Sequence, residues 1–369
     1  MFLRKKTITI KETDLFSKLI CDFIDNDEKL KPFLGDFPTL KSVKSSIGNI
    51  NNHCRVDLVE TLREQYNQTS FSNVKLSAVE SNINKLLDLN AYTITTGHQI
   101  HLLASPLFLI YKIISTIAYA NYLNEKIPKH HCVPCFWMAT EDHDFDEINS
   151  FELYNETYSW NVESSGPVGD FSTKSIIPIL NSIESVLKQS SFGSELYSIY
   201  SHAYMKNEKY ADAIRSLLSS FFGEFGLVVI DPNHRRLKKL FVNEFKDEIN
   251  NNLVFTQILN TNKKMSENYK PQINALHSNI FYLSKSVRSK IEFDGDKYFS
   301  KIHNKIWNKS DLLSEIDDFP ENFSPNVFLR TLYQQRIMPN ALYLGGANEI
   351  AYWLQLKDLF EKMSINYPV

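Results

Sequence analysis

The stretch CVPCFWMATEDHDFDEIN, residues 132–149, joins a short apolar run directly to a cluster of acids. The apolar run predicts a buried β-strand despite Pro134, because a run of this length bounded by polar residues is typical of a core strand. The acids that follow are Glu141, Asp142, Asp144, Asp146 and Glu147, with His143 among them. We therefore expect the strand to end at the edge of a site, where these acids face solvent or a ligand.

The residues before this strand predict a β–α–β unit. AYTITTG (91–97) is a β-rich run closed by Gly97, and the apolar segment 105–126 has Ser105 at a plausible N-cap and Pro106 at the first helical position. Residues 91–139 thus read as strand, loop, helix and strand. A right-handed crossover between parallel strands is the expected geometry.

Later segments extend the same pattern. GLVVIDPN (226–233) predicts a strand and a turn, SPNVFLRTLYQQ (324–335) a helix beginning at Ser324 and Pro325, and NALYLGG (340–346) a last strand before a last helix. Alternating strands and helices predict an α/β fold with a doubly wound parallel sheet and helical insertions. We expect a helical part over residues 1–90 and a core over 91–369, with insertions at about 150–215 and 255–320.

Composition excludes several classes of protein. The 369 residues are 43% hydrophobic and 13% aromatic, and a net charge of −3 provides no general basic face for nucleic acid. The N-terminus lacks the apolar stretch of a signal peptide, and no window approaches the roughly 20 apolar residues of a membrane span. Four cysteines do not form a disulfide framework in so long a chain, so a reducing cytoplasm is the expected location.

Three turns should meet where the parallel strands end, because ligands of open α/β sheets bind beyond the carboxyl ends of the strands. They are residues 96–106, 140–149 and 344–349. In the first, His98 offers a titratable ring and Gln99 a neutral amide. The helix after Ser105 would direct its positive N-terminal dipole to the same place, so His98 and this helix start could bind an anion. The alternative is a helix cap with an incidental histidine.

The acid turn allows three interpretations. Asp142, His143, Asp144 and Asp146 could bind a divalent metal, since hard cations prefer oxygen ligands. The carboxylates could instead hold an ammonium or a hydroxyl-rich substrate without a metal, or the turn could be a solvated loop before a helix. The Gly and the terminal Glu of an EF-hand loop are missing.

The last two segments offer further binding groups. Gly345 and Gly346 could expose backbone amides to an anion ahead of a helix that carries Glu349 and Tyr352. The helix after Ser324 offers Asn326, Arg330 and Tyr333, and Arg330 could clamp a carboxylate or a phosphate. The alternative for this helix is an ordinary amphipathic one whose arginine pairs at the surface.

Taken in order, several segments resemble the BshC family, the cysteine ligases of bacillithiol biosynthesis. The resemblance runs from about residue 90 to the C-terminus and is most specific in EDHDFDEIN and in the glycine turn. The segments are TGHQIHLLASPLFLIYKI, PCFWMATEDHDFDEIN, GLVVIDP, SPNVFLRTLYQQ and YLGGANEIAYWLQLK.

The resemblance implies a Rossmann-like core of the nucleotidyltransferase type and a C-terminal coiled-coil domain that makes a homodimer. Since the last residues, INYPV, look like the opening of one more strand, we expect that domain to be missing here. The implied reaction joins the carboxyl of cysteine to the amine of glucosaminyl malate. ATP or another nucleotide is a reasonable activating group, because forming an amide from a free carboxylate is uphill in water.

Roles follow as hypotheses. His98 and the helix start at Ser105 would bind an anion, either malate or phosphate. Asp142 and His143, with Asp144 and His98, are the catalytic candidates; the expected substrate-binding residues are Gln99, Ser105, Glu141, Asn326, Arg330, Tyr333, Gly345, Gly346, Glu349 and Tyr352. Many members of the family read TGQQ where this chain reads TGHQ, and they often have Pro and Gly where it has Ala347 and Asn348. The rival functions are a synthetase-like nucleotidyltransferase that adenylates another small acid, a non-catalytic scaffold of a dimer, and a metal-dependent hydrolase.

Overall fold

A four-stranded parallel sheet forms the centre of the molecule. The computed structural model describes residues 7–50, 54–163, 166–284 and 287–369. In spatial order the strands are β12 (Asn340–Tyr343), β1 (Ala91–His98), β2 (His131–Met138) and β5 (Val228–Ile230). All three neighbouring pairs are parallel, so the predicted α/β fold with a parallel sheet is confirmed.

The order of the strands creates one switch point. The chain passes from β1 to β2 and then to β5 in one direction, and returns to place β12 on the other side of β1. The crevice between the carboxyl ends of β1 and β12 is where such sheets bind ligands.

Pro134 lies within β2, as predicted, at a position before β5 begins to pair with β2 at Cys135. The sheet has an edge there, and an edge tolerates proline.

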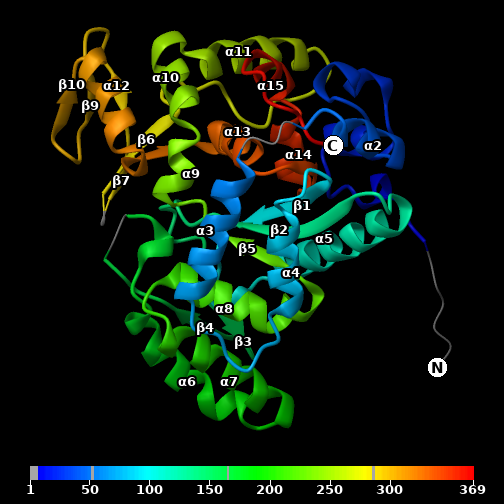
Figure 1. Ribbon diagram of the computed structural model, residues 1–369, viewed down its shortest axis with the longest axis vertical. Helices are drawn as coiled ribbons and strands as arrows, with labels where there is room; N and C mark the ends of the chain where they lie inside the picture. The colour runs from blue at the N-terminus through cyan, green and yellow to red at the C-terminus, as the bar shows by residue number, and fades with distance from the viewer. Residues whose placement is uncertain (1–6, 51–53, 164–165, 285–286) are drawn as a thin grey trace.

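Helices cover both faces of the sheet (Figure 1). Because side chains alternate along a strand, Cys135 and Trp137 of β2 belong to one hydrophobic layer and Phe136 and Met138 to the other. The helices of the first layer include α3 (Arg55–Gln68), α4 (Ser77–Lys85), α9 (Arg235–Lys239), α10 (Val242–Asn251), α13 (Val327–Ile337), α14 (Ala347–Trp353) and α15 (Lys357–Lys362). Those of the second are α5 (Leu107–Lys126), α6 (Ile177–Leu187), α7 (Ser191–Lys206) and α8 (Tyr210–Phe222).

The chain before β1 forms helices in its described part, among them α3 and α4. Its other elements are η1 (Lys11–Thr13), α1 (Lys18–Ile24), η2 (Glu28–Phe33) and α2 (Leu40–Ile47). Ser17 caps α1 and Thr39 caps α2 through their side chains. Helix α2 packs with β1 and β12 in a smaller cluster near the edge of the sheet.

The segments expected as insertions add small sheets and helices. After β2 come β3 (Ser150–Leu153), β4 (Glu156–Ser159), η4 (Val168–Asp170) and η5 (Thr173–Ile176), and η6 (Gly223–Phe225) precedes β5. Before α13 come α11 (Leu253–Met265), β6 (Ile280–Leu283), β7 (Arg288–Lys290), β8 (Glu292–Phe293), β9 (Tyr298–Ser300), β10 (Lys305–Trp307), α12 (Lys309–Asp318), η7 (Pro320–Asn322) and β11 (Phe323–Pro325). This second group lies together at one end of the molecule, beside α10 (Figure 1).

Both predicted Ser-Pro helix starts are wrong in detail. Ser324 and Pro325 belong to β11, and α13 is capped instead by Asn326, whose side chain accepts hydrogen bonds from two backbone amides of the first turn. Before α5, a short 3-10 turn (η3, Leu102–Ala104) intervenes, and the hydroxyl of Ser105 donates to the carbonyl of Leu102. Ser105 is therefore occupied with this turn and does not cap α5.

No helix in the described ranges is long and apolar enough to cross a lipid bilayer.

The last residues of the chain pair with β12. The backbone amide of Tyr343 donates to the carbonyl of Val369, and the amide of Val369 donates to the carbonyl of Ala341. The last residue thus lies along the free edge of β12.

Candidate active site

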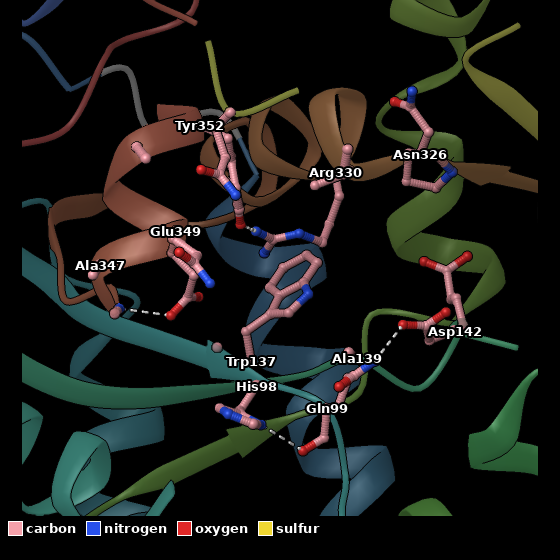
Figure 2. A pocket seen from close by; sticks show the side chains of 18 of the residues that line it. His98, Gln99, Trp137, Ala139, Asp142, Asn326, Arg330, Ala347, Glu349 and Tyr352 are labelled. Atoms are coloured by element: carbon pink, nitrogen blue, oxygen red, sulfur yellow. Dashed lines mark hydrogen bonds between the residues drawn. The ribbon is translucent and has the colours of Figure 1, made fainter. Parts of the chain in front are cut away.

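A cleft of about 1000 Å³ opens at the carboxyl ends of β1, β2 and β12. All three predicted turns contribute to its lining, and so does the first turn of α13 (Figure 2). The predicted site residues that line it are His98, Gln99, Glu141, Asp142, Asn326, Arg330, Gly346, Glu349 and Tyr352. The sheet therefore brings together groups that lie up to 254 positions apart in the sequence, at the switch point that its strand order defines.

On the β12 side, a buried ion pair connects α5 to α14. The ammonium of Lys112 lies 2.5 Å from a carboxylate oxygen of Glu349 and 2.5 Å from the carbonyl oxygen of Gly97. The same oxygen of Glu349 accepts from the amide of Gly346, and the other oxygen accepts from the hydroxyl of Tyr343. Burial disfavours its charge, but Lys112 and these hydrogen bonds hold the pKa of Glu349 below its ordinary value. This network fixes the ends of β1 and β12 to each other.

Arg330 reaches into the same part of the cleft from α13. Its guanidinium donates to the hydroxyl of Tyr352 over 2.6 Å (Figure 2). Arginine remains charged at any physiological pH, and its planar fork suits carboxylates and phosphates. Asn326 lies at the start of the same helix, and its amide nitrogen donates to the side chain of Asn279. Asn326 thus has a structural function as a cap besides its place in the cleft wall.

On the β2 side, Glu141, the first acid of the turn, pairs with a buried cation of the core. Glu141 forms an ion pair with Lys238, which is fully buried and also donates to the carbonyl of Phe323. Burial lowers the pKa of Lys238. A pair of this kind is costly to break, because removal of one partner leaves the other charged and desolvated.

Asp142 is the carboxylate of the turn that faces the cleft. It accepts hydrogen bonds from the backbone amide of His143 (2.8 Å) and from the side-chain amide of Gln99 (3.2 Å). Burial alone would raise the pKa of Asp142. The contact with His143, the charge of Arg288 and the Gln99 hydrogen bond lower it by more than burial raises it, so this pKa lies well below its ordinary value. The group is a fixed negative charge and a weak proton acceptor at neutral pH.

Arg288, from β7, supports this side of the cleft. Its guanidinium donates to the hydroxyl of Ser324 and to the carbonyl of Pro325, and lies 3.0 Å from Nδ1 of His143 and 3.9 Å from Asp142. It also stacks over the ring of Phe281, 3.8 Å from the ring centre. The second predicted insertion therefore contributes a cation to the site.

The surroundings of His98 favour the neutral form of its ring. Burial, followed by the nearby charge of Lys112, lowers its pKa. Nδ1 of the ring lies 3.1 Å from the carbonyl oxygen of Gln99, an acceptor only, so this nitrogen carries the hydrogen and Nε2 is the basic one. Gln99 thus contacts both His98 and Asp142, which places a neutral imidazole and a carboxylate on one connected wall.

Five predicted site residues lie outside the lining of the cleft: Ser105, His143, Asp144, Tyr333 and Gly345. Ser105 lines a separate cavity of about 500 Å³ between η3, β3 and the helices α6 and α7. Tyr333 is completely buried, and its hydroxyl donates to the carbonyl of Pro232. His143 turns toward Arg288 and the ring of Phe281, and the backbone amide of Asp144 donates to Asp142. These two support Asp142 rather than face the cleft.

The predicted glycine cradle is also only partly available. The amide of Gly346 already donates to Glu349. The glycine itself is needed, because a Cβ at this position would lie 2.8 Å from the ring of Phe108, which covers the turn.

As for metal binding, the described residues contain no group of three or more His, Cys, Asp or Glu side chains arranged as ligands.

Sequence reasoning missed three cations: Lys112, Lys238 and Arg288. Lys112 carried a usable signal, since it is the only charged residue between positions 102 and 124, most of them in an apolar helix. Its burial could have been inferred from that isolation, because a lone lysine inside a core helix requires a partner. Lys238 and Arg288 lie in ordinary basic surroundings, and nothing local distinguishes them.

The fold and the site define a class of protein: a Rossmann-like α/β protein with a polar cleft at the switch point of its sheet, where proteins of this architecture bind their ligands. Residues 3–369 match the family model described as Bacillithiol biosynthesis BshC, N-terminal Rossmann-like domain. The chain belongs to this family, as the resemblance implied.

Individual relatives agree with the match. A protein of Flavobacterium johnsoniae named "Putative cysteine ligase BshC" is 40% identical over 98% of this chain and 68% of its own length. Proteins of the same name from Flavobacterium psychrophilum and Bacillus cytotoxicus are 37% and 28% identical, over 98% and 95% of this chain and 68% and 67% of their own lengths. The similarity thus extends across nearly the whole of the present chain.

Proposed function

We propose that this chain is the catalytic core of a ligase that joins the carboxyl of cysteine to the amine of glucosaminyl malate in bacillithiol biosynthesis. Membership of the BshC family supports the reaction. One observation supports the location of the reaction in the cleft. Three strand ends converge there, and the cleft holds a fixed carboxylate, a neutral imidazole and a guanidinium. These three groups can hold an ammonium, accept its proton and bind a carboxylate, which are functions that an amide-forming reaction between an amine and an acid can use.

Asp142 would hold the substrate amine. At neutral pH an amino sugar is largely an ammonium ion, and a carboxylate accepts a charge-assisted hydrogen bond from it. Because its pKa is depressed, Asp142 stays negative and orients the nitrogen without taking its proton. Glu141 would not take part directly, since Lys238 neutralises it.

His98 would accept the proton that the amine must lose before it attacks. A neutral imidazole whose Nδ1 is engaged with a carbonyl presents a basic Nε2, and general bases of this type accelerate proton transfer by about 10²–10⁴-fold. This assignment replaces the expectation that His98 and the start of α5 bind an anion. A neutral ring is a weak anion ligand, and Ser105 lies in the other cavity.

The cysteine carboxyl must be activated, because amide formation from a free carboxylate is uphill in water. An activating nucleotide such as ATP would supply this energy as a co-substrate. The chain's own contribution is to orient the amine beside the acyl carbon, and such positioning contributes several kcal/mol to catalysis.

Thiol profiling of cells tests the proposed function. Cells without the gene should lack bacillithiol and accumulate glucosaminyl malate. Complementation with the unaltered gene should restore the thiol, whereas a gene encoding Asp142→Asn should not, although the variant protein accumulates and melts normally. Bacillithiol at the normal level in the deletion strain would refute the assignment.

We also propose a cytoplasmic location, which rests on the few cysteines, and a homodimer, which rests on the family resemblance. Fractionation of cells would test the first. Light scattering on a protein that includes the coiled-coil domain implied by the resemblance would test the second, with a monomeric mass at all concentrations as the contrary result.

A further inference from the structure

We propose that Arg330 forms a subsite for one carboxylate group at the β12 end of the cleft, so that the malate part of the substrate lies there and its amine lies at the acid end. This inference rests on the proposed function for the identity of the substrate. The subsite itself rests on the charges around Arg330, and it can be tested without the reaction.

The β12 end of the cleft carries one positive charge in excess. Two cations, Lys112 and Arg330, lie there with a single carboxylate, that of Glu349. Lys112 contacts Glu349 directly, and the same carboxylate also accepts from the amide of Gly346 and from the hydroxyl of Tyr343. Within the described residues, no carboxylate forms an ion pair with Arg330.

The side chain that Arg330 contacts directly is neutral, although the nearby charge of Glu349 also stabilises the charged guanidinium. Tyr352 accepts one of its hydrogen bonds, and an arginine has five N–H donors. A guanidinium in a cleft wall with donors left over, held in place by a tyrosine, is ready for a planar acceptor. A carboxylate fits this fork with two parallel hydrogen bonds.

The opposite end of the cleft has no such excess. Glu141 is balanced by Lys238, and Asp142 lies 3.9 Å from the guanidinium of Arg288. The cleft is therefore electrically asymmetric: an anion gains most at Arg330, and an ammonium gains most at the exposed edge of Asp142. This asymmetry orients a substrate that carries both charges.

The excess of one positive charge suits one carboxylate of the ligand, which the guanidinium fork can hold. Total charge does not separate the two candidate anions, because malate carries two carboxylates and a phosphate monoester carries about −1.5 to −2 at neutral pH. The second charge of either anion gains little from Lys290, which lines the cleft but is exposed to solvent. The affinities for malate and for phosphate therefore have to be measured.

Calorimetric titration of the purified chain with L-malate tests the subsite, with inorganic phosphate as the alternative anion and the neutral diamide of malate as the uncharged analogue. Malate should bind, the diamide should not, and Arg330→Gln should weaken malate at least about tenfold. Arg330→Lys should recover part of the affinity, since it keeps the charge and loses the fork. Arg63→Gln, an identical change at an exposed residue that bonds only Asn84, is the matched control and should bind malate as the unaltered chain does.

Several results would overturn the inference: no binding of malate at millimolar concentration, equal binding by Arg330→Gln and the unaltered chain, or Arg330-dependent binding of phosphate but not of malate. The last result would assign the subsite to a phosphate group. Melting curves of both Arg330 variants separate loss of the subsite from loss of the fold. Arg330-dependent malate binding in a protein whose deletion leaves bacillithiol unchanged would keep the subsite and refute the proposed function, so the two failures are distinguishable.

Discussion

The two ends of the cleft use charge in opposite ways. The acid end is rich in carboxylates in the sequence, yet Lys238 and Arg288 offset the two that lie in the cleft wall. In the described part of the chain, the β12 end has two cations and one carboxylate: Glu349 pairs with Lys112, and Arg330 contacts the neutral Tyr352. The density of charged residues along a sequence therefore does not locate the net charge of a site; the cations that arrive from other elements decide it.

The largest effect should come from breaking the buried pair at the acid end. Lys238→Met leaves Glu141 charged and desolvated, so we expect the free energy of unfolding to fall by about 3–5 kcal/mol in urea denaturation. The double variant Lys238→Met/Glu141→Met should recover most of this loss. Lys246→Met, which breaks the more exposed pair with Asp317, should cost less than about 1 kcal/mol. Equal costs for the two single variants would contradict the structural function given to Glu141.

Asp142→Asn should have the next largest effect, on product formation rather than on stability. Replacement of the fixed charge should reduce the formation of bacillithiol by roughly 100-fold, the usual effect of losing one preorganised electrostatic group. Chromatography of cellular thiols measures it. Asp146→Asn, in the same turn but bonded only weakly to Asn149, is the control and should remain active. Full activity of Asp142→Asn would remove the acid end from the mechanism.

Gly346→Ala should perturb the β12 end without changing any charge. The added Cβ would lie 2.8 Å from the ring of Phe108, so the ring or the turn must move, at a cost of about 1–2 kcal/mol. Gly48→Ala meets only an ordinary contact at 3.5 Å and should be nearly neutral. Thermal melting and malate titration would report the two effects. An unchanged melting temperature and an unchanged affinity for malate would show that the covering by Phe108 is loose.

The smallest effect concerns acid sensitivity beside the cleft. Burial and the neighbouring His98 lower the pKa of His101 from its ordinary value of 6.5 to about 4. The unfolded chain therefore binds this proton first, and stability should fall as pH decreases from about 6.5 toward 4, by about 1–2 kcal/mol after allowance for partial exposure. Denaturation at a series of pH values should show a shallower decline for His101→Gln. A parallel decline in both proteins would indicate that other groups cause it.

Much of the fold could be predicted from local patterns. The β1 and β2 runs, the apolar helix between them and the strand in GLVVIDPN have the periodicities that burial on a parallel sheet requires, and the structure confirms them. The Ser-Pro helix starts could not be placed correctly, because Asn326 competes for the cap and Ser105 bonds to the turn before it. The choice between neighbouring capping residues depends on tertiary contacts.

The site could be predicted in outline, since strand ends and their polar turns reveal where a cleft opens. Which side chains face it could not be predicted, because Tyr333 and His143 turn away toward partners that are distant in the sequence, Pro232 and Arg288. The partners of the acids were equally hidden. Lys238 and Arg288 come from α9 and β7, 97 and 146 positions from the acids that they neutralise, and only the packed fold brings them there.

A crystal structure of the chain with bound glucosaminyl malate would test the orientation of the substrate most directly. We expect a malate carboxylate within hydrogen-bonding distance of the Arg330 guanidinium and the sugar nitrogen beside Asp142, with His98 near that nitrogen. A ligand bound in the reverse direction, or in the cavity beside Ser105, would contradict the asymmetry of the cleft and the roles derived from it.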